Sequence, residues 1–439
     1  MLAAAALCLL LAATTPEAVE AADVAPVWAG HPVGFHLLTH GDHQFVAYYD
    51  DQRRMTVAQR RLAADEGPSE WSYTVLPESV GWDSHNSIVM AVDGQDFLHL
   101  SGNMHGHKLV YFRSTRPLDA SSLERVERMT GDLESRVTYP VFLRDHRDRL
   151  LFTYRDGGSG SGNQIYNAYN LEMKRWTRLI DRPLLDGEGA RNAYPMLPVR
   201  GKDGWFHLVW VWRDTPDCAT NHTPSYARSR DLVNWTTWAG DPLELPITLG
   251  ADGVVVDPVP AGGGVINGNV RVGFGLNDQV IVSYHKHDEA GHTQVYNARL
   301  TDAGWDIRRA SDWDYRWEFS GGGSIPFEIR VSAVRVDGDG RLVQPFSHAK
   351  FGSGIWVLDP ETLAVTATEP APPAYPPELT QPESDFPGMQ VRWASDAGTS
   401  PDPRVRYVLR WETLGPNRDR PRPEPWPEPS MLRVYALTR

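Results

Sequence analysis

The sequence has 439 residues, a formal net charge of −13 and no block of basic residues, which excludes nucleic acid as a partner. The same charge repels a polyanion at long range, so an acidic ligand would need local Arg or His side chains. The content of 16 Trp, 16 Tyr, 38 Gly and 34 Pro favours β-strands joined by turns.

The N-terminus, MLAAAALCLLLAATTPEAVEAADV, is typical of a secretory signal peptide over residues 1–22, with cleavage near Ala21 or Ala22. It predicts a secreted or periplasmic protein. No Lys or Arg precedes Arg53, so an apolar N-terminal strand or a misplaced start codon stays open. After cleavage Cys218 is the only cysteine, which rules out an internal disulfide. No later stretch is apolar enough to cross a membrane.

Seven segments share one pattern of short strands joined by polar turns, spaced by about 50–60 residues: Val33–Arg61, His85–Ser114, Tyr139–Trp176, Tyr194–Trp235, Val270–Trp305, Ile329–Leu358 and Met389–Ala436. Four antiparallel strands at this period form a propeller blade. The pattern predicts an all-β, single-domain, seven-bladed β-propeller over residues 23–439, with six or eight blades as alternatives. The Pro-rich stretches 366–387 and Pro416–Pro429 are interpreted as surface excursions.

Polar side chains stand where the first strand of a unit starts and the second ends, and both places lie on one face of a propeller. His85, Asn86, Tyr139 and Tyr194 stand at strand starts, and His105, Arg155, Arg213 and His285 at or just past strand ends. We expect them to meet at one mouth, where ligands bind. Each residue alone is equally compatible with a structural hydrogen bond or a salt-bridged turn.

The chemistry of this set differs from that of most glycoside hydrolases, which use two carboxylates beside the scissile bond. The candidate carboxylates are Asp50, Asp51, Asp83, Asp156 and Asp214, and each stands at or near an Arg, a His or a turn. A Tyr/His/Arg set suits β-elimination at a uronate instead. An Arg neutralises the carboxylate, and Tyr or His moves the protons at C5 and O4.

Several motifs resemble a family of BNR-type seven-bladed propellers: WDSHN (82–86), SGNMH (101–105), TYP (138–140), TYRDGGSGSGNQIYNAYN (153–170), NAYP (192–195), WVWRDTPDCATNH (210–222) and SYHKHD (283–288). That family contains ulvan lyases and enzymes acting on L-rhamnose-α-1,4-D-glucuronate in gum arabic and similar arabinogalactans. The resemblance, closest to the second group, implies a polysaccharide lyase.

The resemblance also implies roles for individual residues. Tyr139 is the general base and can also serve as the acid, while His85 and His105 position or share that proton chemistry. Arg155 neutralises the uronate carboxylate, and Tyr194 supports the substrate. Asn86 and Arg213 stand beside these positions and are further candidates for substrate binding.

Other activities stay open at this point. An α-L-rhamnosidase would cut the same linkage by hydrolysis, and His31 in AGHPVGF is its candidate residue. Ulvan lyase is a second candidate enzyme activity. The alternative that is not an enzyme is a lectin that binds acidic glycans without turnover.

Neighbouring loops carry Cys218 and His222, and His285 and His287, which together predict a structural zinc site. A buried thiol beside unrelated loop histidines is the alternative. No organic cofactor is expected. The predicted partner is an acidic polysaccharide or oligosaccharide, with no nucleic acid and no membrane, and we expect a monomer.

Overall fold

The computed structural model describes residues 15–62 and 68–438, and regular structure in this part of the chain is almost entirely β-strand. The exceptions are four short 3-10 turns: η1 (Ala120–Ser122), η2 (Cys218–Thr220), η3 (Leu276–Asp278) and η4 (Pro377–Leu379). The all-β prediction is confirmed. Among the described residues, no helix is long and apolar enough to cross a membrane.

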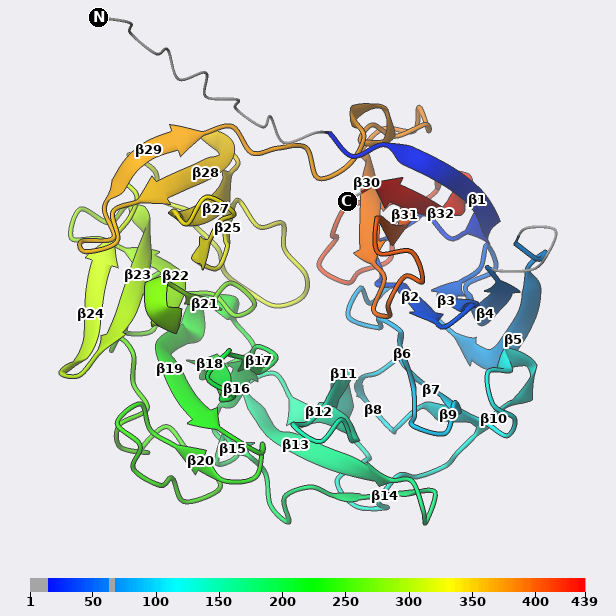
Figure 1. The fold of residues 1–439 in the computed structure, drawn as a ribbon, viewed down its shortest axis with the longest axis horizontal. Helices are drawn as coiled ribbons and strands as arrows, with labels where there is room; N and C mark the ends of the chain where they lie inside the picture. Colours follow the sequence, from blue (N-terminus) through cyan, green and yellow to red (C-terminus); the bar gives the residue numbers. More distant parts are fainter. Residues whose placement is uncertain (1–14, 63–67, 439) are drawn as a thin grey trace, which may run out of the picture.

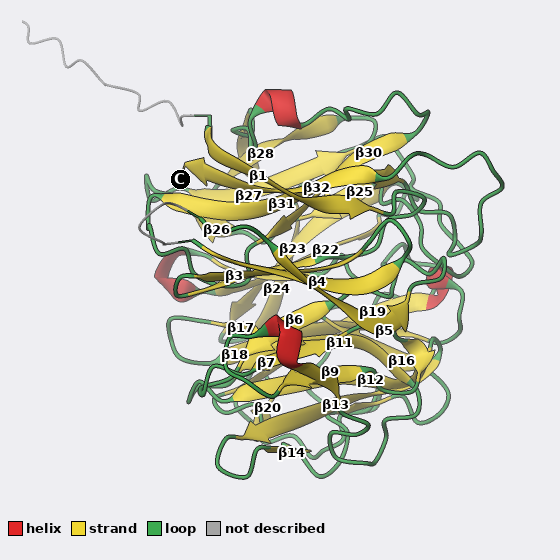
Figure 2. Ribbon diagram, turned by 90° about the vertical axis from the view of Figure 1, so that its right-hand side faces the viewer, coloured by secondary structure: helices red, strands yellow, loops and turns green. Residues whose placement is uncertain are grey.

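The strands form six hydrogen-bonded sheets within the described ranges, arranged around a ring in a propeller-like fold (Figure 1). Figure 1 shows the strands of a sheet following one another from the centre of the ring to its rim, for example β21 to β24. Figure 2 shows the strands running between two faces, with loops gathered on both. One face can therefore collect residues from several sheets.

The first two sheets after the N-terminal strand are simple antiparallel meanders. One contains β2 (His36–His40), β3 (His43–Tyr49), β4 (Arg54–Arg61) and β5 (Ser72–Ser79). The other contains β6 (Val89–Val92), β7 (Leu98–Ser101), β9 (Tyr111–Ser114) and β10 (Leu123–Arg125).

The largest sheet has eleven strands in the described part of the chain. They are β8 (His105–His107), β11 (Val137–Arg144), β12 (Leu150–Gly158), β13 (Ser161–Asn170), β14 (Arg175–Arg178), β15 (Leu185–Asp186), β16 (Asn192–Pro195), β17 (Val199–Arg200), β18 (Phe206–Arg213), β19 (Asn221–Ser229) and β20 (Trp235–Thr236). Two antiparallel meanders, β11 to β14 and β16 to β20, are joined in it by one parallel pair, Gly162 with Asn192.

Two further sheets follow in the chain. One contains β21 (Arg271–Phe274), β22 (Val280–His287), β23 (Thr293–Thr301) and β24 (Gly304–Arg309). The other contains β25 (Ile329–Val331), β26 (Arg335–Val336), β27 (Leu342–His348), β28 (Gly352–Leu358) and β29 (Val365–Glu369).

The last sheet joins the two ends of the described chain. It contains β1 (Ala18–Val27), β32 (Ser430–Thr438), β31 (Val405–Leu414) and β30 (Met389–Ser395) in that order. The first fourteen residues of the predicted signal peptide lie outside the described residues. Its predicted cleavage positions, Ala21 and Ala22, fall within β1, paired with Tyr435 and Val434.

Apolar burial and repeated turns explain why these segments form sheets. All eight residues of β18, FHLVWVWR, are buried, as expected for a strand covered on both faces by neighbouring sheets. Aspartate caps recur at the turns. The carboxylates of Asp93, Asp145 and Asp337 each accept the backbone N–H groups two and four residues later. Asp favours such turns because its side chain replaces a missing backbone partner.

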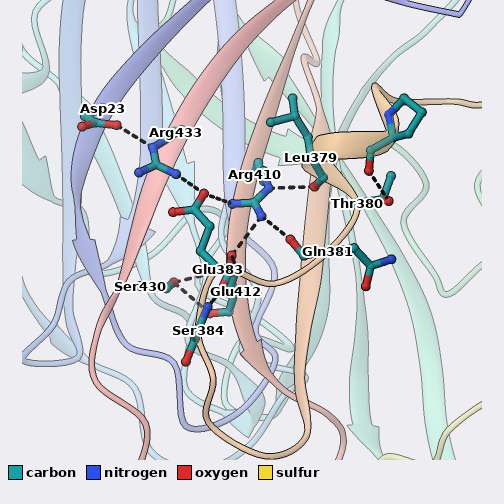
Figure 3. Close-up of polar contacts among 11 residues, drawn as sticks. Asp23, Leu379, Thr380, Gln381, Glu383, Ser384, Arg410, Glu412, Ser430 and Arg433 are labelled. Atoms are coloured by element: carbon teal, nitrogen blue, oxygen red, sulfur yellow. Dashed lines mark hydrogen bonds and ion pairs between the residues drawn. The ribbon is translucent and has the colours of Figure 1, made fainter.

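A buried ion network ties the first Pro-rich stretch to the closing sheet (Figure 3). Arg410, on β31, donates to the backbone oxygens of Leu379 and Gln381 and pairs with Glu383 and Glu412. The segment is thus fastened by buried polar groups that have partners, which avoids the cost of isolated buried charge.

Candidate active site

A cavity of about 530 Å³ opens where loops of several sheets meet. Most of the predicted site residues line it: His85, His105, Tyr139, Arg155, Tyr194, Arg213 and Cys218. The remaining wall is apolar and comes from residues such as Met196, Leu197, Ile266, Ile325 and Phe327. The structure therefore brings together side chains that are more than one hundred residues apart in the sequence.

His85 lies in a turn before β6 rather than at the start of the strand. The carboxylate of Asp83 accepts a hydrogen bond from the backbone N–H of His85 (2.9 Å), and the Asn86 N–H bonds to the carbonyl of Asp83 (3.3 Å). The strand itself begins at Val89. The turn places the imidazole at the cavity instead of in the sheet.

One carboxylate bridges the two histidines of the cavity. Asp83 Oδ1 lies 2.7 Å from Nδ1 of His85, and Asp83 Oδ2 lies 2.6 Å from Nδ1 of His105. The two imidazole rings are 4.3 Å apart between centroids. Because Asp83 engages Nδ1 of both rings, each Nε2 is left without a hydrogen-bond partner among the described residues.

The charges around His85 favour its protonated form. Burial lowers the pKa of His85, but hydrogen bonds to Asp419 and Asp83 outweigh this effect and raise the pKa to about 9. Burial likewise raises the pKa of Asp83, but the hydrogen bonds from His105 and His85 hold it well below its usual range. His85 is thus an imidazolium at neutral pH.

Tyr139 reaches the cavity through a distortion of β11. Its φ is 54°, a left-handed conformation that is uncommon for a non-glycine residue, and the β11–β12 register shifts between Thr138 and Val141. Thr138 pairs with His105 on β8 and with Arg155 on β12, which sets both beside Tyr139. Such strain is held in place by its surroundings and is found at functional sites.

The phenol of Tyr139 is neutral. Its ring lies 5.8 Å from that of His85 and 6.0 Å from that of His105. Burial raises the pKa of Tyr139 well above its usual value and Tyr194 adds to this, while Arg155 and Arg213 lower it only in part. The side chain therefore keeps its proton at neutral pH.

Arg155 is a buried guanidinium at the cavity wall, 3% exposed. Its Nη1 donates to the hydroxyl of Tyr194 (3.3 Å), which also bonds to Ser159 Oγ (2.8 Å). Its Nε has no partner in the described part of the chain, and no carboxylate there pairs with it. Gly162 permits this position, since a Cβ at that residue would lie 2.9 Å from Cδ of Arg155.

Arg213 is also buried and lies over the ring of Tyr194, 5.5 Å from its centroid. Its guanidinium donates to the backbone oxygens of Thr215 and Pro216 and to Asn267. Since those donors are engaged within the protein, Arg213 adds positive charge, and Arg155 offers the free donor. In a chain of net charge −13, this cavity is locally cationic.

Two further predicted residues lie away from the cavity lining. Asn86 is buried, and its carbonyl accepts the Tyr49 hydroxyl (2.7 Å). His31 accepts the indole N–H of Trp28 at Nδ1 (2.9 Å), and its ring lies tilted beside that of Trp82, 5.6 Å between centroids. Burial, with Arg53 nearby, lowers the pKa of His31 to about 4. His31 is thus a neutral imidazole behind the site.

The predicted zinc ligands do not come together. Among the described residues, Asp83, His85 and His105 are the one group of at least three potential metal ligands whose ligand atoms lie within 4.8 Å of one another. His222 instead pairs with Asp214 (3.1 Å), and His285 is buried against Trp317. Cys218 is buried at the cavity wall. The spacing of the loops in the sequence did not reveal that these side chains point to different partners.

In the sequence Asp83 is one of several carboxylates at predicted turns, and Asp419 is a site residue that the sequence did not predict. Asp419 lies in the second Pro-rich stretch, with Oδ2 3.2 Å from Nδ1 of His85 and Oδ1 2.7 Å from Ser84 Oγ. For Asp83 the signal was its position two residues before a candidate histidine. For Asp419, more than 330 residues along the chain, the sequence carried no such signal.

The ring of sheets and the cationic cavity define a propeller-like protein with a cavity of the kind where ligands bind in such folds. The chain belongs to the BNR repeat-containing family, whose model matches residues 43–313. No curated protein matches the chain significantly in sequence.

Among solved structures, the polysaccharide lyase Uly1 is similar over 96% of this chain and 99% of its own, with 13% identity and a TM-score of 0.61. A PL25 ulvan lyase is similar over 95% of both chains, with 12% identity and a TM-score of 0.60. The same values hold for that lyase bound to -[GlcA(1-4)Rha3S]-. At this identity the likeness shows a common fold.

Proposed function

We propose that the protein is a secreted polysaccharide lyase that cleaves at L-rhamnose-α-1,4-D-glucuronate by β-elimination. The observation that carries the proposal is Arg155, a buried guanidinium at the cavity wall with a free Nε and no carboxylate partner in the described ranges. A buried cation without a counter-ion is costly unless an anionic ligand supplies one. The carboxylate of a uronate is such an anion, and a guanidinium binds it through parallel hydrogen bonds.

Neutralising that carboxylate makes the proton at C5 of the uronate more acidic, and the donors of Arg155 stabilise the enolate that develops. The imidazolium of His85 adds positive charge at the same cavity. These groups lower the barrier to removal of the C5 proton.

His105 is the proposed general base. Its Nδ1 is held by Asp83, so a neutral ring presents the lone pair of Nε2. Tyr139, with its pKa raised by burial, is the proposed general acid that protonates the leaving O4. This assignment keeps the acid role that the family resemblance allowed for Tyr139 and moves the base role to His105, because burial disfavours a phenolate.

The reaction balances without an external reagent. His105 takes the C5 proton, the C5–H electrons form the C4=C5 double bond, and the C4–O4 bond breaks. Tyr139 protonates O4, which leaves with the rhamnose. The products are free rhamnose and a 4,5-unsaturated glucuronate.

The apolar wall supports rhamnose as the leaving sugar. Met196, Leu197, Ile325 and Phe327 line the same cavity as Arg155, and Leu197 is 48% exposed. A 6-deoxy sugar has a methyl group that can cover such a surface. No Lys occurs among the lining residues. A sulfated rhamnose would thus bring a second anion to a wall whose other guanidinium, on Arg213, is already engaged.

Product analysis on gum arabic tests the proposal. Ultraviolet absorbance of the unsaturated uronate and free rhamnose are measured together and are expected to rise in equal molar amounts. Rhamnose without absorbance would identify an α-L-rhamnosidase. Binding with neither product would identify a lectin.

Ulvan lyase is the second candidate, favoured by the fold shared with a PL25 ulvan lyase that is also known bound to -[GlcA(1-4)Rha3S]-. Offering ulvan and gum arabic side by side separates the two substrates. Faster absorbance growth on ulvan would overturn the preference for unsulfated rhamnose and leave the lyase chemistry intact.

We further propose that the ring has seven blades. In the described part of the chain, the two meanders of the eleven-stranded sheet are joined by the single parallel pair Gly162 with Asn192. Counting them as separate blades, together with the other five sheets, gives seven.

A further inference from the structure

The loop between β31 and β32 brings a carboxylate to the site from the far end of the chain. Asp419 Oδ1 accepts hydrogen bonds from the backbone N–H (3.1 Å) and hydroxyl (2.7 Å) of Ser84, and Oδ2 accepts the N–H of Ser324 (2.9 Å). Oδ2 also lies 3.2 Å from Nδ1 of His85. Asp419 thus connects the closing sheet, the 320–325 loop and the histidine turn.

The backbone around Asp419 is held in one shape. Arg418 and Asp419 have φ of 55° and 58°, two successive left-handed residues that are not glycine. Arg418 donates to the carbonyls of Ser320 (2.6 Å) and Gly322 (3.2 Å). A Cβ at Gly323 would lie 2.6 Å from the carbonyl oxygen of Arg418, so that position requires glycine. These contacts fix the carboxylate relative to the cavity.

The two carboxylates converge on a single nitrogen of His85. Asp83 Oδ1 and Asp419 Oδ2 lie 2.7 Å and 3.2 Å from Nδ1, which leaves Nε2 for the cavity. Among the carboxylates of the described residues, Asp83 is the one that pairs with His105. Of the two imidazoles, His85 therefore has the greater negative charge around it.

We propose that Asp419 is a positioning residue of the active site: together with Asp83 it fixes the ring of His85 and holds it as an imidazolium at the edge of the cavity. Asp419 does not line the cavity, so it acts through His85. The inference rests on the proposed lyase function for its kinetic consequences only.

The charge of His85 depends on every titratable group that faces it. These are Asp83 from its own turn, His105 from β8, Tyr139 from β11 and Asp419 from the β31–β32 loop. The two carboxylates favour the cation, whereas a charge on His105 would oppose it. Asp419 thus distinguishes two otherwise similar imidazoles, because His85 contacts two carboxylates and His105 contacts one.

The substitution Asp419→Asn removes the negative charge of the carboxylate and keeps the shape of the side chain. The pH dependence of kcat/KM on gum arabic is compared with the ¹⁵N-NMR titration of His85, whose signal is assigned with His85→Gln. We expect kcat/KM to fall about tenfold and the midpoint for His85 to move down by about one pH unit, the effect of losing one nearby charge. Asp419→Glu should restore part of both.

Glu428→Gln is the matched control: it makes the same chemical change at an exposed position in the same loop, and should leave both measurements unchanged. A well-folded Asp419→Asn variant with an unaltered His85 midpoint would overturn the proposal. If that variant does not fold, the wild-type titration decides, because an ordinary midpoint near 6.5 would contradict it. The titration needs no substrate, so it remains informative even if the lyase assignment fails.

Discussion

Two histidine clusters in this molecule use the same residue types for different purposes. His99, on β7, is fully buried, with Nδ1 2.7 Å from the Tyr111 hydroxyl and Nε2 3.1 Å from Asp93 Oδ2. At the cavity, His85 contacts two carboxylates through Nδ1 alone. In the first cluster both ring nitrogens have partners, whereas in the second one nitrogen stays open.

The difference shows what separates a structural histidine from a reactive one. Burial lowers the pKa of His99 despite its contact with Asp93, while two carboxylates raise that of His85 to about 9. The residue type alone therefore does not distinguish these two histidines. They differ in whether a ring nitrogen without a partner faces a cavity. Variants at the cavity and variants away from it should therefore differ in their effects on catalysis and on stability.

The largest contrast is expected between two tyrosines. Tyr139→Phe removes the proposed acid, so kcat should fall on the order of 10²–10⁴-fold with little change in stability. Tyr111→Phe removes the hydroxyl shared by His99 and Trp176, so it should cost about 1–3 kcal/mol of unfolding free energy while kcat is retained. Steady-state kinetics and denaturant unfolding measure both. Equal effects of the two variants on kcat would contradict the contrast.

The second test concerns the free guanidinium. Arg155→Lys keeps the charge and loses the planar fork, so kcat/KM should fall about 10²-fold. Arg144→Lys is the matched control, since Arg144 lies on β11 and donates to the carbonyls of Val92 and Asp148, away from the cavity. A loss no greater at Arg155 than at Arg144 would argue against recognition of a carboxylate.

The two histidines should stabilise the protein at opposite ends of the pH range. The folded pKa of His85 lies above the unfolded value, so its contribution is complete below about pH 6.5 and is lost as the pH rises through about 9. The pKa of His99 is lowered, so its contribution is present above about pH 6.5 and is lost as the pH falls.

Unfolding of wild type and His85→Gln at several pH values checks the first sign. The stability difference should shrink by about 2–3 kcal/mol between pH 6 and pH 9.5. For His99→Gln the difference should shrink on the acid side instead. A pH-independent difference for His85→Gln would mean that the imidazolium does not form.

The smallest effect is expected at Asn86, which is next to His85 in sequence but outside the cavity lining. Asn86→Ala leaves the carbonyl that accepts the Tyr49 hydroxyl in place. Kinetics should show kcat/KM within about threefold of wild type, in line with the modest effect of neutral contacts. A loss of kcat/KM approaching that of Tyr139→Phe would show that Asn86 takes part in the site.

Strand alternation and the repeat predicted the architecture and part of the site. The predicted unit Tyr194–Trp235 contains the buried strand β18, and the placement of strand starts and ends grouped His85, His105, Tyr139, Arg155 and Tyr194. These positions could be inferred because they depend on local register. The left-handed backbone of Tyr139 depends on pairing with two strands, which the local sequence does not specify.

The positions of Asp419 and of the predicted zinc ligands could not be inferred from the sequence pattern. Asp419 reaches His85 through loop contacts that bridge distant parts of the chain, and no periodic pattern encodes them. His222 and His285 stand at suitable spacings but turn toward Asp214 and Trp317. Side-chain direction in long loops is set by tertiary packing rather than by spacing.

The charge around His85 depends on the closing sheet, which contains the last strand to be synthesised. The loop carrying Asp419 is anchored by β31 and β32, and β32 pairs with β1 at the other end of the chain. A nascent chain that stops short of β32 holds Tyr139 and Arg155 but lacks the anchored carboxylate beside His85. The full set of charges around His85 therefore depends on the last strand of the described chain.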